Sequence, residues 1–288
     1  MTKKFFIPLL LMILTFSASA QVEVMSYNIR YANESDGENG WSKRRNHITN
    51  QLKFYEPHVL GLQEALLVQI AHFKENLPGY EYVGVGREDG KQKGEYTAIF
   101  YDTEKLEALE NHTFWLSETP SKVSTGWDAA LPRVCTYLKL KDKQTNQEFW
   151  VFNSHFDHKG EKARFESAKI ILKKIDEVNT QDLPVILMGD FNIEPDAEGI
   201  VVLAEEMNDS KMVCQKVSFG PEGTFNGYNF NEPVTKRIDY IFTSKENIEV
   251  LKYAVLSNSK DLKYPSDHLR WLRGNRFSEI RENYNGKR

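Results

Sequence analysis

The chain has 288 residues, of which 37 are Lys or Arg and 41 are Asp or Glu, giving a formal net charge of −4 at pH 7. This mildly acidic balance contains no basic stripe, which excludes a protein that binds nucleic acid mainly through phosphate charge. The length suffices for one large α/β domain with a sizeable core, or for two small domains.

The first twenty residues predict a secretory signal peptide. The segment begins with two lysines, continues with an apolar run over 5–16 and ends with small residues up to Ala20. These are the three regions of such a peptide. A membrane anchor is the alternative, but the run is too short to span a bilayer comfortably, and no Cys follows it to carry a lipid. We therefore expect cleavage near Ala20, export to the periplasm or the medium, and no stable membrane insertion.

Apolar residues of the remaining chain alternate between strand-like and helix-like spacing. Residues 22–27 alternate with a period of two and predict a strand, and residues 41–55 place apolar side chains on one face of a helix that ends before Pro57. The same criteria predict further strands at 59–62, 80–86, 95–101, 134–140, 149–154, 185–188 and 238–242, and helices at 66–77 and 168–178.

Residues 102–132 are polar and rich in turns, so we expect a long surface loop there. Elsewhere strands interleave with helices, and no linker, repeat or change in composition marks a domain boundary. We therefore expect a single layered α/β domain over residues 21–288. Apolar periodicity does not distinguish one sheet from two.

The two cysteines, Cys135 and Cys214, match no metal-ligand spacing. Export would permit a disulfide between them, whereas the apolar surroundings of Cys135 favour a buried free thiol. The sequence leaves both alternatives open.

Polar clusters follow several predicted strands. They are Ser26-Tyr27-Asn28, Gln63-Glu64, Ser154-His155-Phe156-Asp157-His158 and Gly189-Asp190-Phe191-Asn192, and Ser266-Asp267-His268 comes near the C-terminus, after Arg237-Ile238-Asp239. Layered α/β folds gather ligands at strand ends. Hard oxygen donors suit Mg²⁺, Mn²⁺ or Ca²⁺ beside a phosphate, and a His next to an Asp supplies an oriented imidazole. The set is typical of hydrolysis at phosphorus.

Each cluster alone has an ordinary structural explanation. Asn28 can cap a turn, Glu64 can begin a helix, where acids are favoured, and Arg133 can simply pair with an acid. Glu95 can be a surface carboxylate in a turn, and Asp157 can simply line a cleft. Only the order of the clusters along the whole chain is specific.

In that order the motifs resemble the endonuclease/exonuclease/phosphatase superfamily, which includes pancreatic-type deoxyribonuclease, apurinic endonucleases, bacterial sphingomyelinases and inositol polyphosphate 5-phosphatases. The resemblance runs from Ser26 to His268 and is closest to secreted members from Bacteroidetes-like bacteria. It implies a four-layer αββα sandwich with the site at one end. It also implies a Mg²⁺-dependent enzyme, with Mn²⁺ or Ca²⁺ as alternatives.

The resemblance assigns a role to each matching residue. Glu64 is expected to be the principal metal ligand, with Asn28 and Asp267 shaping the metal and phosphate site. Asp190 is expected to activate or position the attacking water, and Asn192 to orient it.

The histidines and their partners complete the expected site. His268 is expected to contact the phosphate, with Asp239 fixing its tautomer. His155 is the candidate general acid, Glu95 the carboxylate that pairs with it, and Arg133 a phosphate contact.

The function that the resemblance implies is hydrolysis of a phosphoester by in-line attack of water, most simply by a monomeric phosphodiesterase. The sequences at 189–192 and 237–240 favour the nuclease-like or generic side of the family over the inositol phosphatases. The substrate stays open among nucleic acid, nucleotide, phospholipid head group and sugar phosphate. The alternative is a non-catalytic module that binds a phosphate ligand and keeps the sandwich.

After His268 the sequence departs from the family pattern. The family continues with an apolar strand, whereas residues 269–276 are basic and do not alternate. A shift of reading frame just after His268 would explain the change, and a basic C-terminal extension is the alternative. If the tail is translated as printed, we expect a core strand to be lost or replaced.

Overall fold

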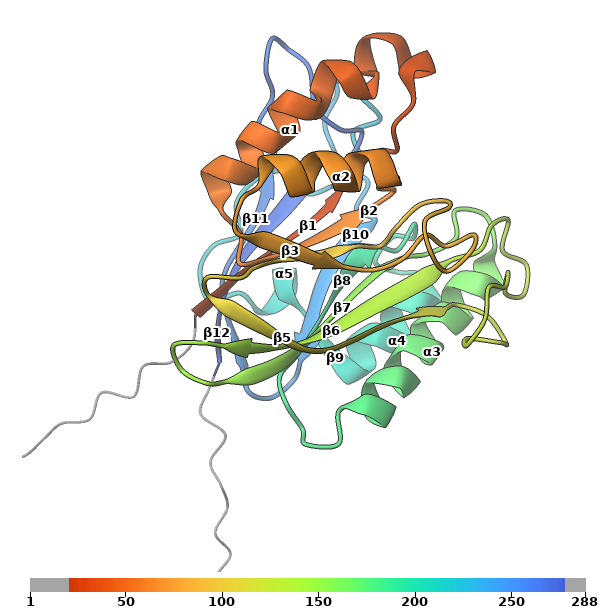
Figure 1. Cartoon of the computed structure of the whole chain (residues 1–288), viewed down its shortest axis with the longest axis vertical. Helices are drawn as coiled ribbons and strands as arrows, with labels where there is room; N and C mark the ends of the chain where they lie inside the picture. Colours follow the sequence, from red (N-terminus) through yellow and green to blue (C-terminus); the bar gives the residue numbers. More distant parts are fainter. Residues whose placement is uncertain (1–20, 278–288) are drawn as a thin grey trace, which may run out of the picture.

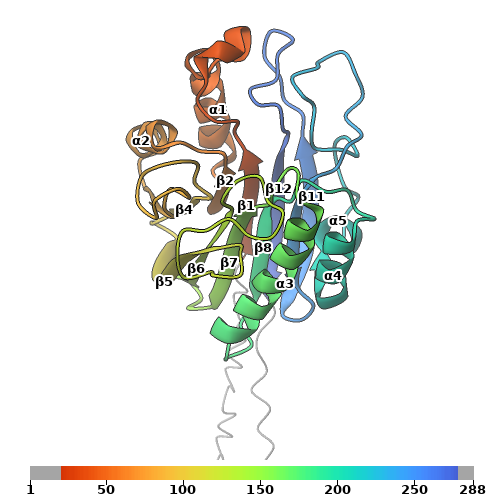
Figure 2. The same cartoon turned by 90° about the vertical axis from the view of Figure 1, so that its right-hand side faces the viewer.

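The computed structural model describes residues 21–277, so the predicted signal peptide at 1–20 lies outside the described residues, as do residues 278–288. Two six-stranded sheets face each other in the middle of the molecule, and helices cover the outer face of each sheet (Figures 1 and 2). The chain therefore forms the expected four-layer αββα sandwich.

The first sheet has the strand order β11-β12-β1-β2-β4-β3 and the second β5-β6-β7-β8-β10-β9. The strands of the first sheet are β1 (Gln21–Asn28), β2 (Val59–Gln63), β3 (Tyr80–Val83), β4 (Ile99–Asp102), β11 (Ile248–Leu256) and β12 (Arg270–Phe277). Those of the second are β5 (Leu106–Trp115), β6 (Val134–Asp142), β7 (Glu148–His155), β8 (Val185–Asp190), β9 (Met207–Asp209) and β10 (Asp239–Ser244).

Helices lie on both outer faces of the sandwich. They are the 3-10 helix η1 (Glu34–Asn39) and the α-helices α1 (Trp41–Tyr55), α2 (Leu67–Asn76), α3 (Glu161–Val178), α4 (Glu198–Glu206) and α5 (Ser210–Val213). Figure 2 shows α1 and α2 on one side of the paired sheets and α3 and α4 on the other.

The alternation of side chains along each strand builds the layers. In β8, Ile186 and Met188 belong to the core between the sheets, whereas Val185 and Leu187 pack with Ile171 of α3 on the outer face. A strand covered on both faces needs apolar residues at every position. This explains the uninterrupted apolar run at 185–188.

The prediction of a surface loop over residues 102–132 is wrong for residues 106–115, which form β5. This strand lies at the edge of the second sheet and pairs with β6. Residues 109–112 in its middle are exposed, so the strand shows no apolar alternation. Edge strands carry polar residues of this kind, and β5 is therefore invisible to apolar periodicity.

The sequence left open whether the unusual tail loses or replaces a core strand, and in the structure the strand is replaced and not lost. Residues 270–277 form β12, which pairs with β1 on one side and β11 on the other. Leu269 and Phe277 are buried in the core between the sheets. Arg270 is buried as well, with Nη2 donating to Asn258 Oδ1 at 2.9 Å and its guanidinium over the Tyr55 ring. The sheet thus accommodates the basic sequence as printed.

Both cysteines are free thiols in the described part of the chain. Cys135 lies in the apolar cluster under α3, and burial raises the pKa of its thiol above the ordinary value. Cys214 packs against the core between the sheets instead. Of the two alternatives left open by the sequence, the structure contains the buried free thiol.

Candidate active site

A cavity of about 490 Å³ opens at one end of the sandwich and collects most of the predicted site residues. Those that line it are Glu64, Glu95, Arg133, His155, Asp190, Asn192, Asp267 and His268. Asn28 and Asp239 lie directly behind them and are buried. The structure therefore brings together residues that are spread over most of the chain.

Three neighbouring strands of the second sheet place acidic and imidazole side chains in one row. His155 ends β7 and Asp190 ends the parallel strand β8, and the two residues are partners in the register. Asp239 begins the antiparallel strand β10 opposite Asp190. Sheet topology thus accounts for the meeting of these residues.

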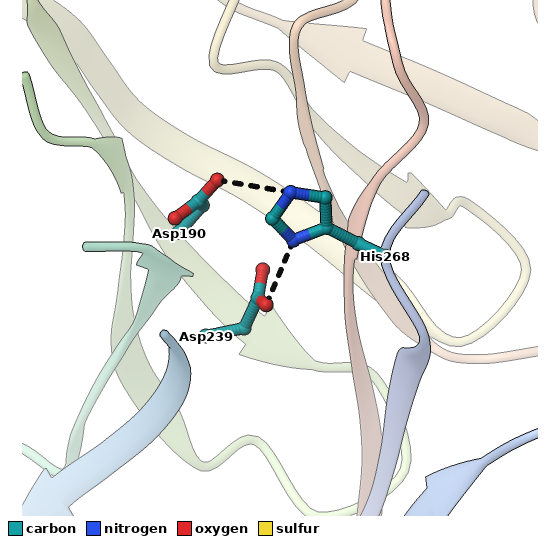
Figure 3. A group of neighbouring side chains, drawn as sticks. All are labelled: Asp190, Asp239 and His268. Atoms are coloured by element: carbon teal, nitrogen blue, oxygen red, sulfur yellow. Dashed lines mark hydrogen bonds and ion pairs between the residues drawn. The ribbon is translucent and has the colours of Figure 1, made fainter. Parts of the chain in front are cut away.

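Asp190, Asp239 and His268 form a buried group at the centre of the site (Figure 3). His268 Nδ1 lies 2.9 Å from Asp239 Oδ2, and its Nε2 lies 3.6 Å from Asp190 Oδ2. Burial opposes a charge on the imidazole, but the carboxylates of Asp239 and Asp190 outweigh it and raise the pKa of His268 well above its usual value. Burial and the charge of Asp239 raise the pKa of Asp190 to about 7.

The amide of Asn28 links the two sheets at the site. Its Nδ2 donates to Asp190 Oδ2 at 2.9 Å and to Glu64 Oε1 at 3.1 Å, while its Oδ1 accepts from the backbone N–H of Arg30. Asn28 therefore aligns two carboxylates of the site, while its oxygen accepts one hydrogen bond from the backbone.

Two of the site residues have an unusual backbone conformation. Glu64 has φ 61° and Asn192 has φ 55°, the left-handed region that non-glycine residues rarely adopt. Contacts hold both in place: Glu64 Oε2 accepts from the backbone of Tyr31, and the N–H of Asn192 donates to Asp190 Oδ1. Such strain concentrates at functional sites, where the surroundings impose a particular side-chain direction.

Two groups of residues in or directly behind the cavity wall have the donors that a divalent cation needs. Glu64 and Asp267 present carboxylate oxygens to the cavity. Burial raises the pKa of Asp267. The charge of His268 lowers this pKa in part, and the negative charge of Glu64 raises it again. Asp190, Asp239 and His268 also present ligand atoms that all lie within 4.8 Å of one another. Both groups fit an ion that prefers oxygen or nitrogen donors.

His155 and Glu95 lie together as expected, but Glu95 has a stronger partner. Its carboxylate lies 3.7 Å from His155 Nδ1, whereas Arg87 Nη1 and Nη2 each donate to it at 2.8 Å. Asn192 Nδ2 lies 3.0 Å from His155 Nε2. Burial, followed by the charges of Arg133 and Arg87, holds the pKa of His155 well below its usual value. His155 is therefore neutral without a ligand.

Arg133 occupies the wall next to His155. Its Nε lies 3.3 Å from Asp157 Oδ2 and its Nη2 lies 3.0 Å from His158 Nδ1. Asp157 and His158, which the sequence placed along a cleft, thus contact a residue that lines the cavity.

The sequence did not reveal several residues that support the site. Arg44 of α1 is buried and donates to the carbonyls of Ile29, Arg30 and Pro265, which joins the end of β1 to the segment before His268. Arg87 belongs to no motif. Its only sequence signal is an Arg directly after a predicted strand.

Comparisons with known proteins agree with the geometry. Residues 25–268 match the model described as the Endonuclease/Exonuclease/phosphatase family. A family protein from Bacteroides thetaiotaomicron is 39% identical with a TM-score of 0.87, covering 91% of this chain and 100% of that one. A mannosyl-6-phosphatase from the same organism is 40% identical with a TM-score of 0.84, covering 88% and 99%.

A curated relative also matches the chain. An uncharacterised protein of Acanthamoeba polyphaga mimivirus is 31% identical over 161 residues, which is 54% of this chain. The match spans 60% of the length of that relative.

Proposed function

Because the chain belongs to the endonuclease/exonuclease/phosphatase family, we propose that it hydrolyses a phosphoester in a reaction that depends on a divalent cation. The observation that carries the proposal is the environment of Asp190. This buried carboxylate borders the cavity between two imidazoles and has a pKa of about 7. A general base is most effective when its pKa lies near the operating pH.

In the proposed reaction Asp190 takes a proton from water while the water oxygen attacks phosphorus in line. The bond from phosphorus to the leaving oxygen breaks, and that oxygen leaves opposite the attacking water. His268, held by Asp239, supplies positive charge to the phosphate oxygens as negative charge develops. Asn192 orients the water and the phosphate. This assignment is supported by the contact of His268 with Asp190 and by the hydrogen bond from the backbone N–H of Asn192 to Asp190.

We propose that Glu64 and Asp267 hold the cation, which is Mg²⁺ with Mn²⁺ or Ca²⁺ as alternatives. Their carboxylates face one cavity, and their mutual repulsion is relieved by a cation between them. In the Asp190–Asp239–His268 group, by contrast, an ion would have to replace the 2.9 Å hydrogen bond between His268 and Asp239. When bound, the cation would neutralise charge on the phosphate.

A phosphorylated sugar is the first substrate to test. The relative described as a mannosyl-6-phosphatase is 40% identical over nearly its whole length. The cavity volume of about 490 Å³ is within the range of small-molecule sites. A phosphodiester is the second candidate, favoured by the His155–Glu95 pair that nuclease-like members use.

The test is release of phosphate from mannose 6-phosphate and of nitrophenol from p-nitrophenyl phosphate and bis-p-nitrophenyl phosphate. Each assay is run with Mg²⁺, with Mn²⁺ and with EDTA. We expect turnover that requires the cation and that Asp190→Asn abolishes. The matched control is Asp196→Asn, an exposed acid on the loop that follows β8. Phosphate binding without turnover of any substrate would favour the non-catalytic module instead.

We also propose that the first twenty residues are removed during export. None of the helices in the described residues is both long and apolar enough to cross a membrane. N-terminal sequencing of the protein recovered outside the cytoplasm tests the proposal. The expected first residue is Gln21, and an N-terminus at Met1 would contradict it.

A further inference from the structure

A second cavity, of about 380 Å³, lies beside α1, and none of the described residues lines both this cavity and the active-site cavity. Its walls come from residues 38–50, which cover the end of η1 and the first part of α1, and from residues 260–265 of the loop between β11 and β12. Figures 1 and 2 show this loop next to α1. The volume is within the range of sites for small molecules.

The helical side of this second cavity carries polar side chains at regular spacing. Four residues of α1 line it at separations of three and four residues, which places them on one face of the helix. They are Lys43, Asn46, His47 and Asn50. Ammonium, amide and imidazole groups all supply hydrogen-bond donors, so this face of α1 presents a row of donors to the cavity.

His47 keeps one donor available to a ligand. The amide nitrogen of Gln51 lies 2.9 Å from His47 Nε2 and can only donate, so Nε2 is the acceptor and Nδ1 carries the proton. Burial, followed by the charges of Arg270 and Lys260, lowers the pKa of His47 and keeps the ring neutral. Nδ1 has no acceptor among the described residues, yet it is not one of their buried unpaired atoms. A ligand in the cavity can therefore reach it.

A tight turn presents two lysines to the cavity from the opposite side. Lys260 and Lys263 are antiparallel partners that exchange both backbone hydrogen bonds at 3.0 Å. The side chains of such partners lie on the same face, where like charges repel. Asp261 and Leu262 between them have φ 51° and φ 58°, a costly conformation for residues other than glycine. The surroundings thus hold a turn that the local sequence disfavours and that brings two positive charges together.

The second cavity carries a surplus of positive charge, although the whole chain has a net charge of −4. Four lysine and arginine side chains line it, against the two carboxylates of Glu38 and Asp261, which leaves two positive charges over. Glu38 pairs with Lys263 at 2.9 Å. Lys43 and Lys260 have no carboxylate at ion-pair distance in the part of the chain that the structure describes. Both ammonium groups are therefore available to an anion.

Arg44 contributes charge to the wall of the cavity without being available as a ligand contact. The residue is 4% exposed, and its Nη2 donates to the carbonyls of Arg30 and Tyr31 at 2.7 and 3.2 Å. Its Nε donates to the carbonyl of Asn39 at 2.8 Å, and Nη1 to that of Pro265 at 3.3 Å. None of these acceptors is a carboxylate, so the positive charge is not neutralised there. It adds to the potential that attracts an anion into the cavity.

We propose that the second cavity binds a phosphate group, either as the free ion or carried on a sugar. A phosphate monoester has a charge of about −1.5 to −2 at neutral pH and three acceptor oxygens, which matches the surplus of two positive charges. Lys43 and Lys260 supply the charge from opposite walls, and His47 donates from Nδ1. Lysine binds phosphate as a point charge, which suits this arrangement. The cavity is larger than a phosphate ion, so the amides of Asn46 and Asn50 are available to sugar hydroxyls.

The experiment follows the NMR signals of the His47 ring while inorganic phosphate is added to the protein in the presence of Mg²⁺. We expect a saturable shift, because a bound anion lies next to the ring. The apparent Kd should rise roughly 10-fold or more in Lys43→Met and in Lys260→Met, since each loses a charge-assisted hydrogen bond. Lys53→Met, which removes an exposed charge of α1 outside the cavity, is the matched control and should leave the Kd unchanged.

The source of the phosphate is distinguished with mannose 6-phosphate and mannose, titrated into Asp190→Asn so that no ester is hydrolysed. Binding of mannose 6-phosphate more tightly than inorganic phosphate would support a sugar-linked group, and the reverse order would support the free ion. Binding of mannose as tightly as mannose 6-phosphate would overturn the inference. So would a His47 signal that does not shift with phosphate, or a Kd that is the same in Lys260→Met and Lys53→Met. None of these outcomes depends on the proposed hydrolysis, which is measured separately.

Discussion

His155 and His268 both place Nε2 3.6 Å from Asp190 Oδ2, yet their charge states differ. His268 Nδ1 has the carboxylate of Asp239 at 2.9 Å, and the two carboxylates keep its imidazole protonated against the cost of burial. His155 has the guanidiniums of Arg133 and Arg87 nearby, and burial and these charges keep it neutral. The charged groups around each imidazole, and not its distance from Asp190, therefore set its charge.

This difference divides the cavity into two walls with separate tasks. In the proposed reaction the wall of His268 and Asp239 supplies a protonated donor for phosphate. The wall of His155 and Arg133 supplies a neutral imidazole beside a fixed cation, which suits recognition of an anionic group. If His155 is the general acid of the proposed reaction, the charge of a bound phosphate must first raise its pKa.

The largest expected effect comes from removing the carboxylate that both histidines share. Asp190→Asn keeps the shape of the side chain but cannot accept a proton from water. We expect kcat for the best substrate to fall by roughly 10⁴-fold, the upper end of the range for a positioned base. Steady-state kinetics at saturating Mg²⁺ measure the loss, with Asp196→Asn as the control. Activity within about 10-fold of the wild type would contradict the role of Asp190 as base.

The second test makes the two histidines more alike. Asp239→Asn removes the charge that keeps His268 protonated and leaves a weaker partner at Nδ1. We expect kcat/KM to fall by roughly 10²–10³-fold, because the imidazole loses both its charge and its fixed tautomer. NMR titration of the His268 ring should show its pKa moving down towards the ordinary value. A variant that loses activity while His268 stays protonated would show that Asp239 acts in another way.

The third test concerns Asp157, the buried carboxylate that pairs with Arg133. The folded pKa of Asp157 is depressed, so its contribution to stability is complete above the unfolded pKa of about 3.9 and is lost as the pH falls below that value. At pH 7, Asp157→Asn should lower the free energy of unfolding by about 3 kcal/mol, as for a broken buried ion pair.

Urea denaturation at a series of pH values measures this contribution. The difference between wild type and Asp157→Asn should shrink progressively from pH 5 towards pH 2. Asp176→Asn, an exposed acid on α3, is the matched control and should be neutral throughout. A difference that does not change with pH would mean that packing, and not charge, is the contribution of Asp157.

The two walls also differ in how far the sequence predicted them. The motifs at 189–192, 237–239 and 266–268 lie at strand ends, so their residues were expected to meet, and they do. Arg87 was not predicted because its partner Glu95 lies across a folded loop, where the backbone N–H of Arg87 donates to the carbonyl of Glu95. A pair of this kind depends on the path of the loop, which carries no periodic signal.

The same limit applies to the sheets. The four-layer fold followed from the family motifs, since apolar alternation did not distinguish one sheet from two. Periodicity located the buried strand at 185–188 but missed β5 at the edge and β12 in the tail. In β12, pairing with β1 and β11 on both sides determines the strand, and tertiary context of this kind overrides a weak local pattern.

The smallest expected effect comes from a variant that favours protonation of His155, as His268 is protonated. Arg87→Met removes a nearby cation and releases Glu95, whose Oε2 already lies 3.7 Å from His155 Nδ1. Both changes favour the protonated ring, so the pKa of His155 should rise by about 1 unit or more. NMR titration measures the shift, and Arg45→Met, an exposed arginine of α1, is the control. Because the rise changes the charge next to Asp190, the pH profile of kcat/KM should move with it while turnover at the optimum changes only about 10-fold. An unchanged pKa would mean that Arg133 and burial alone keep His155 neutral, which would leave Arg87 as a support for the fold of the loop.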